Sequence, residues 1–356
     1  LNSNIYLCPM KEVDYIIVGL GIAGICFAEQ LLAHGKTFVV VDKGRNASTG
    51  VSGGVLNPTV LKRFTVAWNG KEFTETSFAF YRALSEKLSQ SLFQELPILR
   101  ILNSVEEQNN WMVAGDKQAL APFLSSEVIT NENSQIKAPF GFGRVNGAGR
   151  IFPAVLLQAY RRHLESSKFL ISEEMQYDAL VISEENVQYK DISAKKIVFA
   201  EGANAINNPL FPKEYLVPNK GEYIIIHAPE LKTAAILKGP VMLIPLGKDT
   251  YKVGASYGRG DTSNHTTENA KDEICVKLQK MISCPFEVID QVAGVRPTVK
   301  DRKPLMGAMS NNNACIFFNG LGTRGVLMAP RLSEMLFDYC ENGIALPPEI
   351  NIKRFN

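Results

Sequence analysis

The sequence predicts an α/β fold in which a parallel sheet, assembled from separated segments, is interleaved with mainly antiparallel strands. Residues 14–18 form a β-branched run that leads directly into a glycine-rich turn and an apolar helix, as in a buried strand followed by its crossover. Residues 221–260 instead read as short strands joined by turns, which is typical of antiparallel structure. A late strand at 314–318 then enters a second glycine-rich loop and a helix over 326–339. This order indicates a two-domain enzyme with a discontinuous nucleotide-binding sheet.

Length and composition fit one large two-part enzyme. The chain has 356 residues, 46% hydrophobic and 21% charged, which is enough for a substantial core. The near balance of 38 basic and 36 acidic residues argues against a nucleic-acid coat or a membrane-surface protein. The six cysteines are scattered and the four histidines lie far apart, so we expect reduced thiols and no zinc site.

We expect a cytoplasmic location. No apolar run is long enough for a membrane helix, and residues 1–9 lack the charged and apolar regions of a signal peptide. Met10 is the expected translation start, with the preceding residues an extension.

The turn at residues 19–24, GLGIAG, carries the strongest functional prediction. Gly19 permits a tight turn, Gly21 lets the backbone approach a pyrophosphate, and Gly24 lets the helix pack closely on the strand. The helix N-terminus offers free N–H groups to phosphates. The next strand, 38–41, ends on Asp42, at about the spacing from which an acid reaches the ribose hydroxyls. The pattern predicts one dinucleotide, FAD or NAD, because no second unit of this kind follows.

The remaining elements are predicted from periodicity and turn residues. Helices are expected over 73–93, 154–164 and 266–281, strands over 169–171 and 196–200, a hairpin over 178–191, and short strands and loops over 98–145.

Five ordered motifs extend the prediction. They are the turn at 19–24, the small-residue segment 47–58, the Pro-led helix start at 151–154, the strand end at 198–202, and GVRP at 294–297 followed by the loop 320–325. With these motifs the chain resembles the D-amino acid oxidase family of FAD-dependent oxidoreductases, which includes glycine oxidase and sarcosine oxidase, over residues 14–355. Within the family it is most similar to the oxidase module of the bifunctional tRNA wobble-uridine modification enzyme, whose late Gly-x-Arg-Gly loop matches residues 322–325. Glu201 departs from the family, which commonly has threonine there.

The resemblance implies a Rossmann-type FAD-binding domain, formed by residues 12–72, 146–215 and 294–345, with an interleaved, mainly antiparallel β substrate domain, formed by 73–145 and 216–293. It implies non-covalently bound FAD. The residues expected to bind FAD are Gly19, Gly21, Ile22, Ala23, Gly24, Asp42, Lys43, Ser48, Gly53, Gly54, Val55, Ala200, Gly202, Gly320, Gly322, Thr323, Arg324, Gly325 and Val326.

The resemblance also implies the reaction. A hydride passes from the carbon beside an amine to flavin N5, and the resulting imine is hydrolysed. Arg296 is the expected catalytic-site residue that pairs with a substrate carboxylate through its planar fork of donors, the alternative being a structural bond to a backbone carbonyl or Asp290. Arg324 is a second catalytic candidate that would stabilise reduced flavin, the alternative being an outward-facing side chain.

Other charged residues beside the motifs are weaker candidates. Lys62, Arg63, Arg302 and Lys303 could bind an anionic substrate or assist oxygen reduction, although solvated surface charge is the commoner role.

Met242 stands where glycine oxidase has a tyrosine that helps hold the substrate carboxylate. Methionine cannot donate that hydrogen bond, which disfavours a small free amino acid as substrate. Tyr223, Tyr251 and Tyr257 lie nearby in sequence. The expected partners are a small amine and either O2 or an electron-transfer protein, with nucleic acid only as a modified-tRNA substrate. Two alternatives remain open, a 2-hydroxy-acid dehydrogenase on the same fold and a non-catalytic flavin- or RNA-binding relative.

Overall fold

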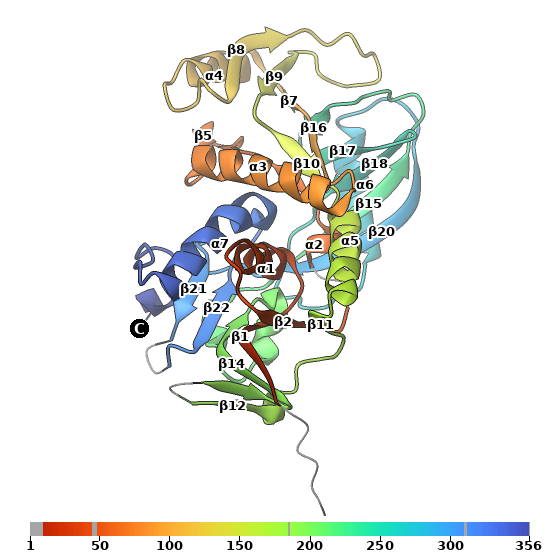
Figure 1. The fold of residues 1–356 in the computed structure, drawn as a ribbon. Coiled ribbons are helices and arrows are strands. Elements are labelled where there is room, and N and C mark those ends of the chain that lie inside the picture. The colour runs from red at the N-terminus through yellow and green to blue at the C-terminus, as the bar shows by residue number, and fades with distance from the viewer. Residues whose placement is uncertain (1–9, 45–47, 184–185, 310–311, 356) are drawn as a thin grey trace, which may run out of the picture.

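The computed structural model describes residues 10–44, 48–183, 186–309 and 312–355, and it confirms the α/β class (Figure 1). The predicted N-terminal extension, Cys8 and Ala47 lie outside these residues. Two large sheets dominate the part that is described, with helices α3 and α5 lying beside and between them.

The first sheet is the predicted nucleotide-binding sheet. Its parallel strands run in the order β11, β2, β1, β14, β22, and β21 adds antiparallel to β22. The hairpin β12–β13 pairs with the first half of β14. The strands are β1 Lys11–Val18, β2 Phe38–Val41, β11 Leu170–Ile171, β12 Leu180–Ile182, β13 Val187–Tyr189, β14 Ile192–Phe199, β21 Leu305–Ala308 and β22 Cys315–Asn319.

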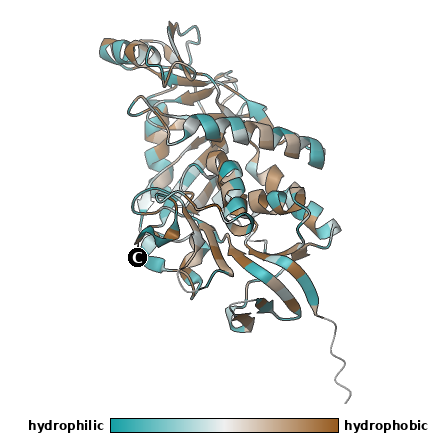
Figure 2. Ribbon diagram, turned by 60° about the vertical axis from the view of Figure 1, so that its left-hand side comes forward, coloured by the Kyte–Doolittle hydropathy of each residue, from teal (hydrophilic) through white to brown (hydrophobic). Residues whose placement is uncertain are grey.

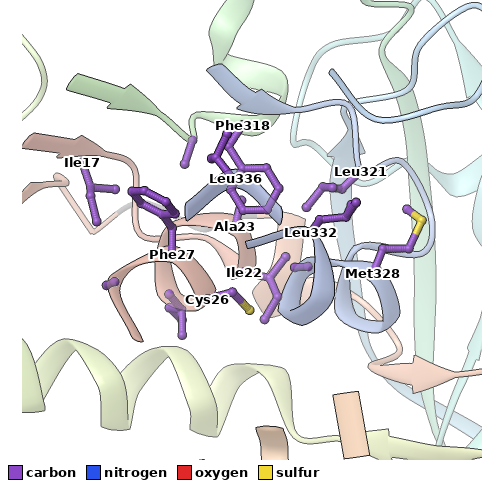
Figure 3. Close-up of a cluster of buried hydrophobic side chains, with 14 of the residues drawn as sticks. Ile17, Ile22, Ala23, Cys26, Phe27, Phe318, Leu321, Met328, Leu332 and Leu336 are labelled. Carbon is purple, nitrogen blue, oxygen red and sulfur yellow. The ribbon is translucent and has the colours of Figure 1, made fainter. Parts of the chain in front are cut away.

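Both faces of this sheet are buried, which explains the continuous apolar runs in its strands. Ile17 of β1 packs under the helices α1, Ile22–Ala33, and α7, Gly325–Glu341, while its neighbour Ile16 faces the opposite core. Figure 3 shows α1 and α7 meeting over the sheet through small and branched side chains. Figure 2 shows hydrophobic residues concentrated in the strands and polar residues toward the outside.

The second sheet is mainly antiparallel. Its order is β19, β15, β18, β17, β16, β7, β9, β8, with β20 on the other edge of β15; only β16 and β7 run parallel. The strands are β7 Ile98–Ile101, β8 Leu124–Ile129, β9 Phe142–Val145, β15 Asn219–His227, β16 Ile236–Lys238, β17 Met242–Gly247, β18 Thr250–Gly254, β19 Gly258–Arg259 and β20 Glu287–Arg296.

Short elements and the remaining helices complete the fold. One small sheet has three strands, in the order β3 Val55–Leu56, β10 Gly149–Ile151 and β6 Phe93–Glu95. A second has two strands, β4 Thr59–Val60 and β5 Thr65–Val66. The helices are α2 Ser48–Val51, α3 Gly70–Leu88, α4 Val105–Gly115, α5 Pro153–Ser166 and α6 Glu268–Gln279, with 3-10 turns at Tyr177–Ala179, Gly202–Asn207, Lys213–Tyr215 and Ile352–Phe355.

Two expectations about elements were wrong, and one strand was missed. The helix expected over 73–93 is α3, which ends at Ser89 in the left-handed region (φ 50°), so that residue 93 begins β6. Residues 98–145 contain α4, whose N-cap Ser104 accepts a hydrogen bond from the N–H of Glu107 at 3.1 Å. The pattern Ser-x-x-Glu marks such a helix start in the sequence. Strand β20 was not predicted, because its sequence, EVIDQVAGVR, does not alternate regularly between apolar and polar residues.

The division into two domains remains a prediction, and two elements join its parts. Helix α3, assigned to the substrate domain, packs on α7 and shares the core of the nucleotide-binding sheet. Strand β20 crosses the expected boundary at 293/294 without interruption and pairs with β15 up to Arg296.

In the described part of the chain no helix is both long and apolar enough to cross a membrane. The five cysteines described there are free thiols, and no cluster of three metal-binding side chains occurs among those residues.

Candidate functional site

A cavity of about 770 Å³ lies between the two sheets, within the size range of cofactor and ligand sites. The β1–α1 turn, α2 and the N-terminus of α7 form one side, and β15, β17, β18 and β20 form the other. The predicted residues that line it are Gly19, Gly21, Ile22, Ala23, Asp42, Lys43, Ser48, Gly53, Gly54, Val55, Ala200, Gly202, Met242, Arg296, Gly322, Thr323, Arg324, Gly325 and Val326.

The β1–α1 turn has the shape that a pyrophosphate requires. Gly19 adopts φ 102°, and a Cβ there would lie 2.6 Å from the carbonyl oxygen of Ala200. Gly21 is the N-cap of α1 and offers no side-chain cap, while the N–H of Ile22 donates to Thr49 Oγ1 at 3.1 Å. A Cβ on Gly21 would meet only Thr49 Oγ1, at 3.6 Å, so this glycine keeps cavity space open beside the helix start. Helix dipole and free amides there favour a phosphate.

Asp42 lies at the end of β2, beside that turn. Its Oδ2 accepts from the N–H of Leu20 at 2.9 Å and its Oδ1 from the N–H of Gly44 at 2.7 Å. Arg161 of α5 forms an ion pair with the same carboxylate. The carboxylate is therefore fixed in orientation at the cavity wall, which suits an acceptor for ribose hydroxyls. The role of Arg161 was not foreseen, because α5 is distant in sequence from Asp42.

The small-residue segment forms the junction between the two sheets. The hydroxyl of Ser48 donates to the carbonyl oxygen of Val295, and Lys252 Nζ donates to the carbonyl oxygens of Val51 and Ser52 at 2.8 and 3.0 Å. A Cβ on Gly53 would lie 2.6 Å from Ile244 Cδ1. Hydrogen bonds from the second sheet thus hold the segment in place, and at Gly53 there is no room for a larger residue.

Arg324 precedes α7 and lines the cavity, but its guanidinium is engaged by the protein. Nη1 donates to the carbonyl oxygen of Asn57 at 2.7 Å and Nη2 to that of Thr59 at 2.9 Å. Burial lowers its pKa. Arg324 therefore positions the chain after β3. Gly322, two residues earlier, adopts φ 53° and faces open cavity space.

Arg296 ends β20 and points across β15 toward the cavity. Its Nη1 donates to Asn219 Oδ1 at 2.9 Å and, at 3.3 and 3.5 Å, to the carbonyl oxygens of Lys220 and Ser256. Among the described residues no carboxylate forms an ion pair with it, so pairing with Asp290 is not seen, whereas the expected backbone bonds are. Its Nη2 occupies the place of a side chain on Gly221, where a Cβ would lie 1.9 Å away.

Two tyrosines accompany Arg296 in the cavity. Tyr223 of β15 places its hydroxyl 3.5 Å from where a Cβ of Gly53 would be, and burial raises its pKa while the charge of Arg296 opposes that rise. The guanidinium of Arg296 stacks 4.9 Å from the ring centroid of Tyr257, which is 72% exposed at the cavity edge. A phenol beside a guanidinium that forms no ion pair among the described residues suits the binding of a carboxylate.

Met242 lines the cavity, and its strand register relates it to Tyr223. Met242 and Tyr223 both pair with Gly254, from opposite sides of β18, so the two side chains face the same surface of the sheet. The hydroxyl absent at 242 is available two strands away. Sequence alone could not reveal this, because it depends on strand register.

Four predicted residues do not line the cavity. Gly24 and Gly320 are required by close packing. A Cβ on Gly24 would lie 2.0 Å from the carbonyl oxygen of Gly19, and a Cβ on Gly320 would lie 2.7 Å from Val299 Cγ2. Lys62 is exposed in the turn between β4 and β5. Lys303 Nζ lies 3.9 Å from the ring centroid of Trp68. The expected roles of these lysines in binding substrate find no support in their positions.

Glu201, which departs from the family pattern, is a buried carboxyl in the cavity wall. Tyr177 donates its hydroxyl to one oxygen, and Asn208 Nδ2 donates to the other at 2.7 Å. Burial raises its pKa. Both oxygens of the Glu201 carboxyl group therefore accept hydrogen bonds from the protein itself.

These features fit a dinucleotide. The glycine-rich start of α1, the acid at the end of β2 and the loop at 322–326 converge on one wall, and Arg296 and Tyr223 lie on the facing wall.

Comparisons with known proteins agree with this arrangement. A family model described as FAD dependent oxidoreductase matches residues 14–339. A glycine oxidase of Bacillus licheniformis is 23% identical, covering 92% of this chain and 93% of its own. The tRNA 5-methylaminomethyl-2-thiouridine biosynthesis bifunctional protein MnmC of Marinobacter nauticus is 20% identical over 91% of this chain, which spans 54% of that protein. The crystal structure of glycine oxidase from Geobacillus kaustophilus superposes with a TM-score of 0.78 at 17% identity, covering 94% of this chain and 96% of the other.

Proposed function

The chain belongs to the family of FAD-dependent oxidoreductases whose model matches residues 14–339, and from this premise we propose that it oxidises the C–N bond of an amine that carries a carboxylate. The observation that carries the proposal is the pair formed by Arg296 and Tyr223, facing the small-residue segment across the cavity. The glycine oxidases among the relatives support an amine rather than another donor.

FAD, when bound, supplies the acceptor for a hydride from the carbon beside nitrogen. The protein's own residues position the substrate for that transfer. Arg296 would hold the carboxylate, Tyr223 would donate a hydrogen bond to it, and Tyr257 would cover the guanidinium from solvent. Fixing one end of the substrate in this way orients its amine carbon, which is a major part of the rate gained in such reactions.

The cofactor would be held by the β1–α1 turn, Asp42, the segment 48–55 and the loop 322–326. No cysteine or histidine of the described residues lines the cavity, which supports non-covalent binding. The electron acceptor is proposed to be O2 or an electron-transfer protein, and the proposed location is the cytoplasm. A modified tRNA is proposed as a substrate only if it carries a carboxylate-bearing amine. The MnmC relative supports the last of these.

The proposal is tested by loading the protein with FAD and adding amines and 2-hydroxy acids without oxygen. We expect carboxylate-bearing amines to bleach the flavin, and Arg296→Met to slow bleaching by about 100-fold, the loss of one desolvated charge pair, while FAD stays bound. Bleaching by hydroxy acids alone would replace the amine with that substrate class. A flavin that neither class bleaches would instead favour the non-catalytic reading.

A further inference from the structure

Lys238 is a cation in the substrate half of the cavity that the proposed reaction does not use. It ends β16 and pairs with Met242 on β17, Met242 pairs with Gly254 on β18, and Gly254 pairs with Tyr223 on β15. Residues directly opposite in neighbouring antiparallel strands project to the same face of a sheet. All four line the cavity, so they form one continuous row along its substrate wall.

The row separates two positive charges. Lys238 and Tyr223 are three strand spacings apart, which places their Cα atoms about 14 Å from one another. Arg296 lies at the Tyr223 end, because its guanidinium rests on Gly221 of the same strand. The two side chains stand at opposite ends of the row, so the gap between their charges suits a short substrate rather than a single carboxylate.

In the described part of the chain, no ion pair neutralises the charge of Lys238. Its Nζ donates to the carbonyl oxygen of Gly239 at 2.7 Å, and within the described residues it forms no ion pair. Its neighbour on β7, Arg100, is already paired with Glu107 at 2.8 Å. Burial, with repulsion from Arg100 and Lys277, lowers the pKa of Lys238 to about 8. An anion entering from the cavity would relieve this repulsion and favour the charged amine.

Resting on the proposed function, we propose that the substrate carries a second anionic group, a carboxylate or a phosphate, at the end remote from the oxidised carbon, and that Lys238 binds it. The first carboxylate lies at Arg296 and the remote anion at Lys238, with the amine carbon between them. Lys238 is thereby a specificity residue, which selects amines that are acidic at both ends over amines that are acidic at one.

The test uses the FAD-loaded enzyme and matched ligands. Each N-alkylglycine is paired with an N-(carboxyalkyl)glycine and an N-(phosphonoalkyl)glycine of equal chain length, over several lengths. Dissociation constants come from the change in the flavin spectrum or from calorimetry, and bleaching rates are measured separately. We expect the doubly acidic ligands of the best length to bind about 10–100-fold more tightly than the matched N-alkylglycine, as one charge-assisted hydrogen bond provides. The acid that gains more affinity, carboxylate or phosphonate, identifies the remote anionic group of the substrate.

Two variants decide whether Lys238 is responsible. Lys238→Met should remove the preference while leaving N-alkylglycine affinity unchanged, and Lys238→Arg should retain most of it. Lys303→Met is the control, because Lys303 lies outside the cavity against Trp68, and it should keep the full preference.

Equal affinity for both ligand types, or a preference that survives in Lys238→Met, overturns the inference. If no amine bleaches the flavin, the proposed function fails, but the dissociation constants still decide the role of Lys238.

Discussion

Single side chains define the substrate end of the cavity, and Tyr223 is the one whose role differs most from expectation. With methionine at 242, the hydroxyl that faces the carboxylate site comes from another strand of the same sheet. Burial raises the pKa of Tyr223, and its neighbours, the charge of Arg296 and the backbone of Gly53, oppose that rise. On the proposed function, Tyr223 would supply the hydroxyl that Met242 lacks.

Tyr223→Phe tests that reassignment. Removing one hydrogen bond to a charged ligand should weaken binding of a carboxylate-bearing amine about 10-fold, while FAD binding stays the same. Tyr251→Phe is the matched control, because Tyr251 lies on β18 and its hydroxyl accepts from the N–H of Thr233. Spectral titration of the FAD-loaded proteins without oxygen measures both. Equal affinities of wild type and Tyr223→Phe for the amine would mean that the hydroxyl of Tyr223 does not bind the carboxylate.

At the scale of elements, the β1–α1 unit shows how one glycine motif serves two purposes. Gly21 opens toward the cavity, whereas Gly24 faces the preceding strand, where a Cβ would lie 2.0 Å from the carbonyl oxygen of Gly19. The same three-glycine pattern thus combines a binding requirement with a packing requirement.

The two glycines should therefore respond differently to alanine. Gly21→Ala has room for its methyl group and should leave the melting temperature of the apoprotein almost unchanged, but weaken FAD binding at least about 10-fold by intruding on the helix start. Gly24→Ala should destabilise the fold itself, by about 2–4 kcal/mol, because backbone must move to admit the methyl group. Thermal melts of the apoproteins and FAD titrations separate these effects. Similar behaviour of the two variants would contradict the division of roles.

At the scale of the whole molecule, the sequence predicts what is local and misses what depends on long-range register. The turn containing Gly21 and the acid Asp42 could be placed because strand, turn, helix and strand are consecutive. Tyr223 and Lys238 could not, because their common face follows from pairing among four strands. Lys303 was predicted to lie in the site because it is close to a family motif in sequence, yet its side chain lies against Trp68.

The junction between the two sheets should contribute to the stability of the whole molecule, and Lys252 makes it testable. This lysine extends from β18 to the carbonyl oxygens of Val51 and Ser52, and burial lowers its pKa from 10.5 to about 8. Between those two values the unfolded chain binds a proton that the folded protein does not, so the contribution of Lys252 to stability increases as pH rises through this window.

Lys252→Met removes that titration. Relative to this variant, wild type should gain on the order of 2–3 kcal/mol in free energy of unfolding between pH 8 and 10.5. Denaturant unfolding of both proteins across this range measures the difference, and groups that titrate in both proteins cancel. Lys248→Met, in the exposed turn before β18, is the control and should show no such trend. A wild-type advantage that stays constant with pH would mean that Lys252 keeps an ordinary pKa, and hence that the junction between the sheets is open to water.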